Sequence, residues 1–249
     1  MDALVHYVAA DGVATITLDS PHNRNALSRQ LVTELLASLD RAADDDAATV
    51  VVLRAEGRVF CSGADLSEAS SGGMEEGTRA MVEMQRRIVA HPKPVVTRLH
   101  GAVRAGGIGI VAASDVVVAA EDATFALTEV KLGLAPAVIS LTVLPRLTSR
   151  AAQLTCLGGE VFSGAQAAEY GLVTSAVPAD ALDDAVAAVC ASLATGAPQG
   201  LRETKRLLNA PLLARIDAHE DEMAALSARL FGSDAAREAM TAFLSRRRA

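Results

Sequence analysis

Two glycine-rich segments follow apolar β-type runs and could bring backbone N–H groups to a ligand. The first spans residues 57–66 (GRVFCSGADL) after the run 50–53, and the second spans residues 101–109 (GAVRAGGIG) after the run 94–99. Ligands of α/β sheets bind beyond the carboxyl ends of the strands, and small residues let the backbone approach them closely. Exposed N–H groups at such turns stabilise negative charge. Together the segments suggest an oxyanion hole, although each alone is also explained by tight packing.

Other glycine motifs do not fit these segments. Gly101 and Gly106 have the first spacing of a GxxxxGK[ST] phosphate loop, but Gly107 and Ile108 stand where Lys and Ser or Thr are needed. Neither segment contains the GxGxxG dinucleotide fingerprint. Phe60 stands two residues before Ser62, which excludes a GxSxG nucleophile elbow. The sequence therefore offers N–H donors without an evident nucleophile beside them.

Glu129 is the candidate acid–base group. It lies in the largely apolar segment 124–136 (TFALTEVKLGLAP), and burial among apolar side chains would raise its pKa toward the range useful for proton transfer. Taken alone, a glutamate at this place is more often a helix cap or an ion-pair partner. His91 and His100 flank the run 94–99 and are interpreted as strand-end or loop histidines rather than bases.

The elements that must position these residues begin with a predicted hairpin, because Asp11-Gly12 separates the β-type runs 4–8 and 13–18. Alternating strand and helix patterns follow: helices at 28–39, 78–90 and after Gly106, strands at 50–53, 94–99 and 116–119. This alternation predicts βαβ units. Helical patterns dominate from 149 onward, including separate helices at 201–208 and 212–230. We expect an α/β core over residues 1–190 and a helical region over 191–249.

Composition limits the class of protein. The 249 residues carry 23 Lys and Arg against 30 Asp and Glu, a net charge of −7, which disfavours nucleic acid and anionic membrane as partners. Three widely spaced cysteines without a zinc-type cluster predict a reduced, cytoplasmic protein without a metal site. No apolar run reaches the length of a membrane span, and the N-terminus has no signal-peptide pattern.

In order along the chain, these motifs resemble the crotonase family, the enoyl-CoA hydratase/isomerase superfamily. The match is carried by the segments 23–28 (NRNALS), 60–66 (FCSGADL), 92–96 (PKPVV), the glycines 101, 106 and 107, the pair 114–115 (SD), 125–136 with Glu129, Gly133 and Pro136, 157–173 and 243–247 (FLSRR). It covers nearly the whole chain. Its closest resemblance is to bacterial enoyl-CoA and methylglutaconyl-CoA hydratases.

The resemblance implies a crotonase-like α/β spiral of ββα units with a helical C-terminal trimerisation region, assembled as a homotrimer or a dimer of trimers. The ligand would be an acyl-CoA thioester, with coenzyme A as part of the substrate and no separate cofactor. By the family's motif, the thioester oxygen is held by the N–H groups of Ala64 and Gly106. The substrate- or CoA-contacting positions would be Arg24, Ala26, Ser62, Asp65, Leu66, Ala102, Gly109, Phe243 and Arg246.

The chain departs from the family's hydratases at one position. They use two glutamates, and Glu129 matches the second; where the first is expected, three residues after Gly106, this sequence has Gly109. Hydration of a 2-enoyl-CoA by Glu129 acting alone is the first interpretation. A Δ3,Δ2-enoyl-CoA isomerase, which needs one base, and a weakly active or non-catalytic acyl-CoA binder are the alternatives. If only the acid is missing, Gly109→Glu is expected to raise hydration.

Overall fold

The hairpin predicted from Asp11-Gly12 opens the fold. The computed structural model describes residues 2–65, 68 and 74–246, and in it β1 (Val5–Ala10) pairs antiparallel with β2 (Val13–Leu18). Asp11 and Gly12 both have positive φ, 49° and 79°. This is the backbone conformation that a two-residue hairpin turn requires, and Asp-Gly adopts it readily.

Two sheets follow from the alternating patterns. The six-stranded sheet has the order β1-β2-β3-β5-β7-β10 and the four-stranded sheet the order β4-β6-β8-β9. Only β1–β2 and β8–β9 pair antiparallel among the strands described; the other pairs are parallel. The strands are β3 (Val50–Ala55), β4 (Val59–Cys61), β5 (Val95–Leu99), β6 (Ala102–Arg104), β7 (Val116–Ala120), β8 (Thr124–Ala126), β9 (Phe162–Ser163) and β10 (Ser175–Val177).

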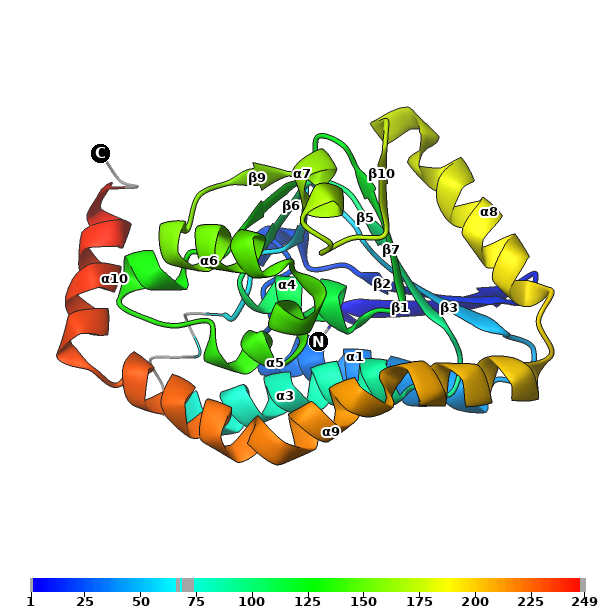
Figure 1. Ribbon diagram of the computed structural model, residues 1–249, viewed down its shortest axis with the longest axis horizontal. Helices are drawn as coiled ribbons and strands as arrows, with labels where there is room; N and C mark the ends of the chain where they lie inside the picture. The colour runs from blue at the N-terminus through cyan, green and yellow to red at the C-terminus, as the bar shows by residue number, and fades with distance from the viewer. Residues whose placement is uncertain (1, 66–67, 69–73, 247–249) are drawn as a thin grey trace.

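Helices cover both sheets. They are α1 (Arg29–Asp44), α3 (Met74–Ala90), α4 (Gly106–Ala113), α5 (Ala137–Arg146), α6 (Ser149–Gly158), α7 (Gly164–Glu169), α8 (Leu182–Ala194), α9 (Pro198–Phe231) and α10 (Asp234–Arg246), with 3-10 turns η1 (Pro21–Asn23), η2 (Glu129–Leu132) and η3 (Ala179–Ala181). Helix α8 packs on β3, β5 and β7, on the side of the sheet away from α9 (Figure 1). The expected boundary at residue 190 falls within α8 and stays a prediction.

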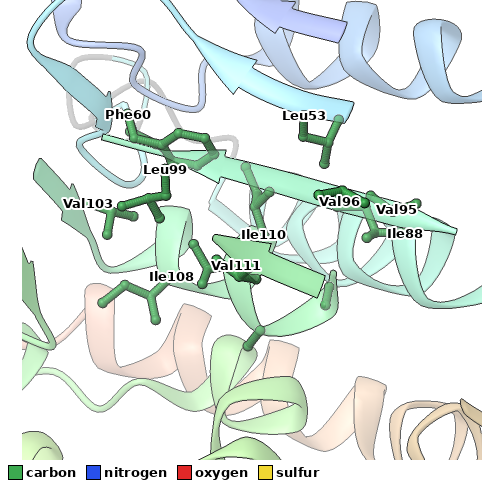
Figure 2. Packing of buried hydrophobic residues seen from close by; sticks show 14 of the residues in the cluster. Leu53, Phe60, Ile88, Val95, Val96, Leu99, Val103, Ile108, Ile110 and Val111 are labelled. Atoms are coloured by element: carbon green, nitrogen blue, oxygen red, sulfur yellow. The ribbon is translucent and has the colours of Figure 1, made fainter. Parts of the chain in front are cut away.

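Helix α4 lies at the centre of the core. All eight of its residues are buried, and a helix that is apolar on every side is stable only when protein surrounds it. Figure 2 shows Ile108, Ile110 and Val111 of α4 beneath side chains of β5 such as Val96 and Leu99. The start of α4, at Gly106, is therefore fixed by the best-packed part of the molecule.

The prediction of two helices at 201–208 and 212–230 is wrong. They form the single helix α9, with Pro211 inside it, although proline removes one backbone hydrogen bond and disfavours a helix interior. Buried anchors on both sides of Pro211 offset this cost: Lys205 and Asn209 before it, and Leu212 and Ile216 after it. As a result, α9 runs without a break along α3 and α5 (Figure 1).

A buried ion pair fastens α9 to the core. Lys205 Nζ lies 2.7 Å from Asp115 Oδ2 and donates to the carbonyl oxygens of Ile88 and Lys93 at 3.1 and 3.0 Å. Asn209 Nδ2 donates to the other carboxylate oxygen of Asp115 at 2.9 Å. The side chain of Lys205 is 6% exposed and that of Asp115 is 18% exposed, so removal of one partner would leave a poorly compensated charge in a largely buried place.

We therefore expect Lys205→Met to lower the free energy of unfolding by about 3–5 kcal/mol. Arg202→Met, one turn earlier on the exposed side of α9, removes only a surface pair with Glu203 and should cost less than about 1 kcal/mol. Urea denaturation of the two variants measures the difference. Equal, small losses would contradict the assigned role of Lys205.

Candidate active site

The two glycine-rich segments lie against each other. Leu27 N donates to Gly63 O at 2.8 Å, and residues 27 and 64 form an isolated parallel bridge. Gly63 has a φ of +92°, and a Cβ built on it would lie 3.0 Å from Ala105 Cβ and 3.6 Å from Gly106 N. The fold thus places Gly63, which precedes Ala64, against the start of α4 at Gly106. The resemblance implies Ala64 and Gly106 as N–H donors, and this role stays a prediction.

The second donor lies at a helix start that no side chain caps. Ala105 precedes α4 with φ 44° and ψ −120°, and it makes no side-chain cap hydrogen bond. A positive φ on a residue with a Cβ is strained, and such strain persists where surrounding structure enforces it, often at functional sites. The first N–H groups of a helix have no intrahelical acceptor and carry the positive end of the helix dipole. An oxyanion at this helix start would therefore be stabilised.

Glu129 is the candidate acid of the site. Its side chain is 9% exposed, and its buried Oε2 atom has no hydrogen-bond partner among the described residues. Burial raises the pKa of Glu129 from 4.5 to about 7, opposed weakly by a backbone hydrogen bond. A buried polar atom without a partner is rare in folded proteins. Together with a pKa near neutrality, it marks Glu129 as a candidate for proton transfer.

Close backbone packing holds the Glu129 turn. Glu129 is the first residue of η2, which ends at Gly133 in the left-handed conformation. A Cβ on Gly133 would lie 3.1 Å from Ala235 O at the start of α10. On the other side, Lys131 pairs with Glu160 after α6 at 2.7 Å. The turn thus lies between the end of α6 and the start of α10.

The space beside Gly109 is already filled. A Cβ built there would lie 2.9 Å from Ile139 Cγ2 and 3.1 Å from Gln85 Cδ. A glutamate at position 109 would therefore need both neighbours to move. The expectation that Gly109→Glu would simply supply a missing acid conflicts with this packing, which the sequence could not show because Gln85 and Ile139 come from other helices.

Three residues expected to contact CoA lie close together. Ser62 N donates to Arg24 O at 3.1 Å, and Asn23 Nδ2 donates to Asp65 Oδ2 at 3.2 Å. Arg24 is exposed with a φ of 62°. A charged group is thus available beside the first glycine-rich segment.

The other expected contacts are more dispersed. Ala26 is buried in the same segment as Arg24, whereas Ala102 lies in β6 between β4 and β8. Phe243 and Arg246 fall within α10, and their contact with CoA stays a prediction. Leu66 lies outside the described residues. No part of these assignments is tested by the fold alone.

Both histidines have structural partners, as expected. Burial and the nearby Lys205 lower the pKa of His91 to about 4, and its ring accepts from Lys93 N and contacts Leu39 O, each at 3.1 Å. His100 Nε2 lies 2.7 Å from Gly57 O. Both imidazole rings are thus engaged in hydrogen bonds near the two ends of β5, and neither is assigned to the candidate site.

Sequence reasoning missed the side chains of α3 that cover the start of α4. Met81 lies against Gly106 and Gln85 against Gly109. Gln85 is also hydrogen-bonded to Thr142. The available signal was a glutamine on a helix face that otherwise carries apolar residues, Met81, Met84 and Ile88.

Among the described residues no group of three or more His, Cys, Asp or Glu could hold a metal ion, and no described helix is long and apolar enough to span a bilayer.

Comparison with known proteins identifies the family. A family model described as Enoyl-CoA hydratase/isomerase matches residues 9–249. The chain is 46% identical to an enoyl-CoA hydratase from Mycobacterium avium, whose crystal structure superposes with a TM-score of 0.93 over 99% of this chain and 98% of that one. The chain belongs to the enoyl-CoA hydratase/isomerase family. The crotonase-like fold expected from the sequence, with two sheets and C-terminal helices, is confirmed.

Two further relatives carry names of different reactions. The chain is 32% identical over 246 residues to a Bacillus subtilis protein named "Probable enoyl-CoA hydratase", covering 95% of this chain and 93% of that protein. It is 31% identical over 246 residues, with the same coverage, to the Escherichia coli protein named 1,2-epoxyphenylacetyl-CoA isomerase. Similarity at this level therefore includes both a hydratase and an isomerase.

The raised pKa of Glu129 has a consequence for stability. The folded state binds the Glu129 proton more tightly than the unfolded state, so the free energy of unfolding falls as pH rises from 4.5 to about 7. Glu129→Gln removes this loss. We expect the variant to be more stable than the parent by on the order of 2–3 kcal/mol above pH 7, with the difference shrinking toward pH 4.

Denaturant unfolding at a series of pH values measures this difference. The surface substitution Glu169→Gln on α7 controls for the general effect of losing one carboxyl group. If the difference in the free energy of unfolding between Glu129→Gln and the parent stays the same from pH 4 to pH 8, Glu129 is not desolvated.

Proposed function

We propose that this protein binds an acyl-CoA thioester and transfers a proton at its α-carbon, with Glu129 as the acid–base group. The N–H groups of Ala64 and Gly106 would hold the thioester oxygen as it gains negative charge. The observation that carries the proposal is the presence of three features in one fold: two facing glycine turns, an uncapped helix start and a desolvated carboxyl. Ala105 N, just before that helix, donates to Ala126 O at 3.4 Å, three residues before Glu129. Loss of one oxyanion donor typically costs about 3 kcal/mol of transition-state stabilisation, which makes this pair the largest electrostatic contribution proposed.

Hydration of a 2-enoyl-CoA is the reaction we propose first, because relatives at 46% and 32% identity are named enoyl-CoA hydratases. The Glu129 carboxylate would take a proton from water while the water oxygen bonds to C3 of the enoyl group. The displaced electron pair forms an enolate at the thioester oxygen. Protonated Glu129 then returns the proton to C2, so that H and OH are added and the carboxylate is regenerated. A pKa near 7 suits a group that must accept and then donate.

Double-bond isomerisation is the second candidate, and Gly109 favours it. The position offers no side chain to activate a water, and its space is occupied by Ile139 and Gln85. Glu129 alone could remove a proton from C2 of a 3-enoyl-CoA and return it to C4. A relative at 31% identity is named 1,2-epoxyphenylacetyl-CoA isomerase, so isomerisation of a CoA ester is named among similar proteins.

The CoA portion would lie along Arg24, Ala26, Ser62, Asp65, Leu66 and Ala102, with Gly109 nearer the acyl group and Phe243 and Arg246 near the nucleotide. Arg24 is exposed and could pair with a phosphate of CoA, since guanidinium groups bind phosphate through two parallel hydrogen bonds. No cofactor beyond the substrate's own CoA is proposed.

An assay with a small panel of esters tests the proposal: crotonyl-CoA, 3-methylcrotonyl-type and methylglutaconyl-type esters, and a 3-enoyl-CoA. Water addition identifies a hydratase, and migration of the double bond alone identifies an isomerase. Glu129→Gln should lower turnover by at least about 100-fold while acyl-CoA affinity stays within about threefold. Binding without any conversion would place the protein with the non-catalytic acyl-CoA binders, and turnover within tenfold of the parent would remove Glu129 from its role.

We also propose that the protein assembles as a ring, a homotrimer or a dimer of trimers. Two separate surface patches expose large apolar side chains: Leu144, Leu207 and Leu208 on α5 and α9, and Leu154, Leu157 and Val161 on and after α6. Two different patches that bind each other head to tail generate a closed ring when the rotation between neighbouring subunits closes on itself, and the resemblance to trimeric family members implies such closure. Exposed leucines that gather on helix faces mark such contacts.

Sedimentation equilibrium of the parent should give a multiple of three chains. Leu208→Glu on α9 and Leu157→Glu on α6 should each dissociate the assembly, because each patch takes part in every contact of a ring. The substitution Val8→Glu, at an exposed residue of β1, controls for added surface charge. A monomeric parent, or assembly unchanged in both leucine variants, would contradict the ring.

A further inference from the structure

Two side chains of α3 fill the space left by two glycines of α4. Met81 and Gln85 are one turn apart on α3, and Gly106 and Gly109 are one turn apart on α4. A Cβ on Gly106 would meet the Met81 methyl group, and a Cβ on Gly109 would lie 3.1 and 3.2 Å from Cδ and Oε1 of Gln85. The helices α3, α4 and α5 are mutually packed (Figure 1). The Gln85 amide therefore lies where all three helices meet.

Gln85 is fully hydrogen-bonded at that position. Its side chain is 1% exposed, and Oε1 accepts from Thr142 Oγ1 of α5 at 2.6 Å. Nε2 donates to Met81 O of its own helix at 3.0 Å and to Val138 O of α5 at 3.4 Å. Thr142 is itself fully buried. The amide thus links α3 to α5 through two hydrogen bonds that pass beside Gly109.

The two linked helices adjoin the two halves of the proposed site. Helix α4, packed between α3 and α5, begins at Gly106, the proposed oxyanion donor. Helix α5 begins at Ala137, a short connection after the turn η2 that starts with Glu129. The hydrogen bonds of Gln85 therefore tie the helix that follows the Glu129 turn to the helix that covers the start of α4. An amide is neutral at every pH, so the link itself carries no charge.

Stability alone does not account for a polar pair at this place. A buried hydrogen-bonded pair contributes little more than two apolar side chains of the same shape would, and sometimes less. Fully satisfied polar networks instead specify one arrangement of the elements they join. The directional contacts of Gln85 and Thr142 have the geometry for that task.

We propose that Gln85 and Thr142 are positioning residues: the hydrogen bond between them keeps the helix start at Gly106 and the turn at Glu129 in the separation that proton transfer at C2 requires. This inference rests on the proposed function for its kinetic consequence. Its structural consequence, the confinement of the Glu129 turn, can be measured without any turnover.

The chain offers a matched control at the other end of α4. Thr97 Oγ1 and Ser114 Oγ are also buried and lie 2.7 Å apart, but Ser114 follows the last residue of α4. Thr97→Val and Thr142→Val each replace a buried, hydrogen-bonded hydroxyl by a methyl group. The two variants should lose similar stability, so any difference in catalysis reports on position.

Kinetics of Thr142→Val, Gln85→Met, Thr142→Ser and Thr97→Val provide the first measurement. We expect Thr142→Val and Gln85→Met to lower kcat by about 10- to 100-fold with KM within about threefold, since a displacement of about 1 Å can cost that much in rate. Thr142→Ser retains the hydroxyl and should restore kcat to within about threefold. The double variant Gln85→Met/Thr142→Val should be no slower than the worse single variant, because both remove the same link.

The second measurement is the pKa of Glu129, determined by ¹³C NMR with Glu129→Gln used to assign the signal. The titratable and charged groups of neighbouring elements include Cys156 of α6, whose pKa is raised mainly by burial and further by Glu129. The others are the pair Lys131–Glu160 and the pair Arg237–Asp234 of α10. All variants leave these groups in place. If the link confines the turn, Thr142→Val and Gln85→Met admit water, and the pKa falls from about 7 toward 4.5. Thr97→Val and Thr142→Ser should leave it at the parent value.

These readouts separate the two proposals. A parent that converts none of the esters contradicts the proposed function, while the Glu129 pKa in the variants still decides the positioning role. An unchanged pKa in Thr142→Val and Gln85→Met, or an equal loss of kcat in Thr97→Val, would overturn the inference. If either Thr142→Val or Gln85→Met fails to fold, the other of the two, compared with Thr142→Ser, still tests the positioning role.

Discussion

Desolvation of one carboxyl group is the constraint on which the site depends. Glu129 is 9% exposed and its Oε2 atom has no partner among the described residues, so its ionised form is held in an unfavourable environment. The turn that carries Glu129 is packed by segments far apart in sequence: Gly159 after α6 lies against Lys131 and Val130 of the turn, and Ala235 of α10 lies against Gly133. The same burial that lowers stability at neutral pH gives the carboxyl a pKa at which it can both take and return a proton.

Glycines make the second half of the site possible. Gly106 meets Met81, Gly107 meets Cys61 at 2.7 Å from its would-be Cβ, and Gly109 meets Ile139 and Gln85. A helix with side chains at these positions could not approach α3, β4 and α5 so closely. Burial of the start of α4 places its N–H groups in a surrounding of low polarity, where their field on a ligand is stronger than in water. The close packing of α4 and the strong field of its first N–H groups thus both depend on Gly106, Gly107 and Gly109.

The sequence predicted those features that depend on local residues or on motifs. The hairpin followed from Asp11-Gly12, the buried strands from their apolar runs, and the raised pKa of Glu129 from its apolar neighbours. Contacts between distant segments could not be predicted: the packing of Gln85 and Ile139 beside Gly109 arises from three helices meeting, and no local pattern encodes it. The continuity of α9 through Pro211 was missed for a similar reason, because tertiary anchors such as Lys205 override the local preference against proline.

Exchange of the C2 protons of butyryl-CoA in D2O tests the central claim most directly. This saturated ester cannot add water or move a double bond, so exchange requires only an oxyanion site and a base. The account predicts that the parent protein incorporates deuterium at C2 with a rate that rises with pH to a plateau above about 7, and that Glu129→Gln, still binding the ester, does not. Exchange that persists in Glu129→Gln, or a parent that binds butyryl-CoA without exchange at any pH, would contradict it.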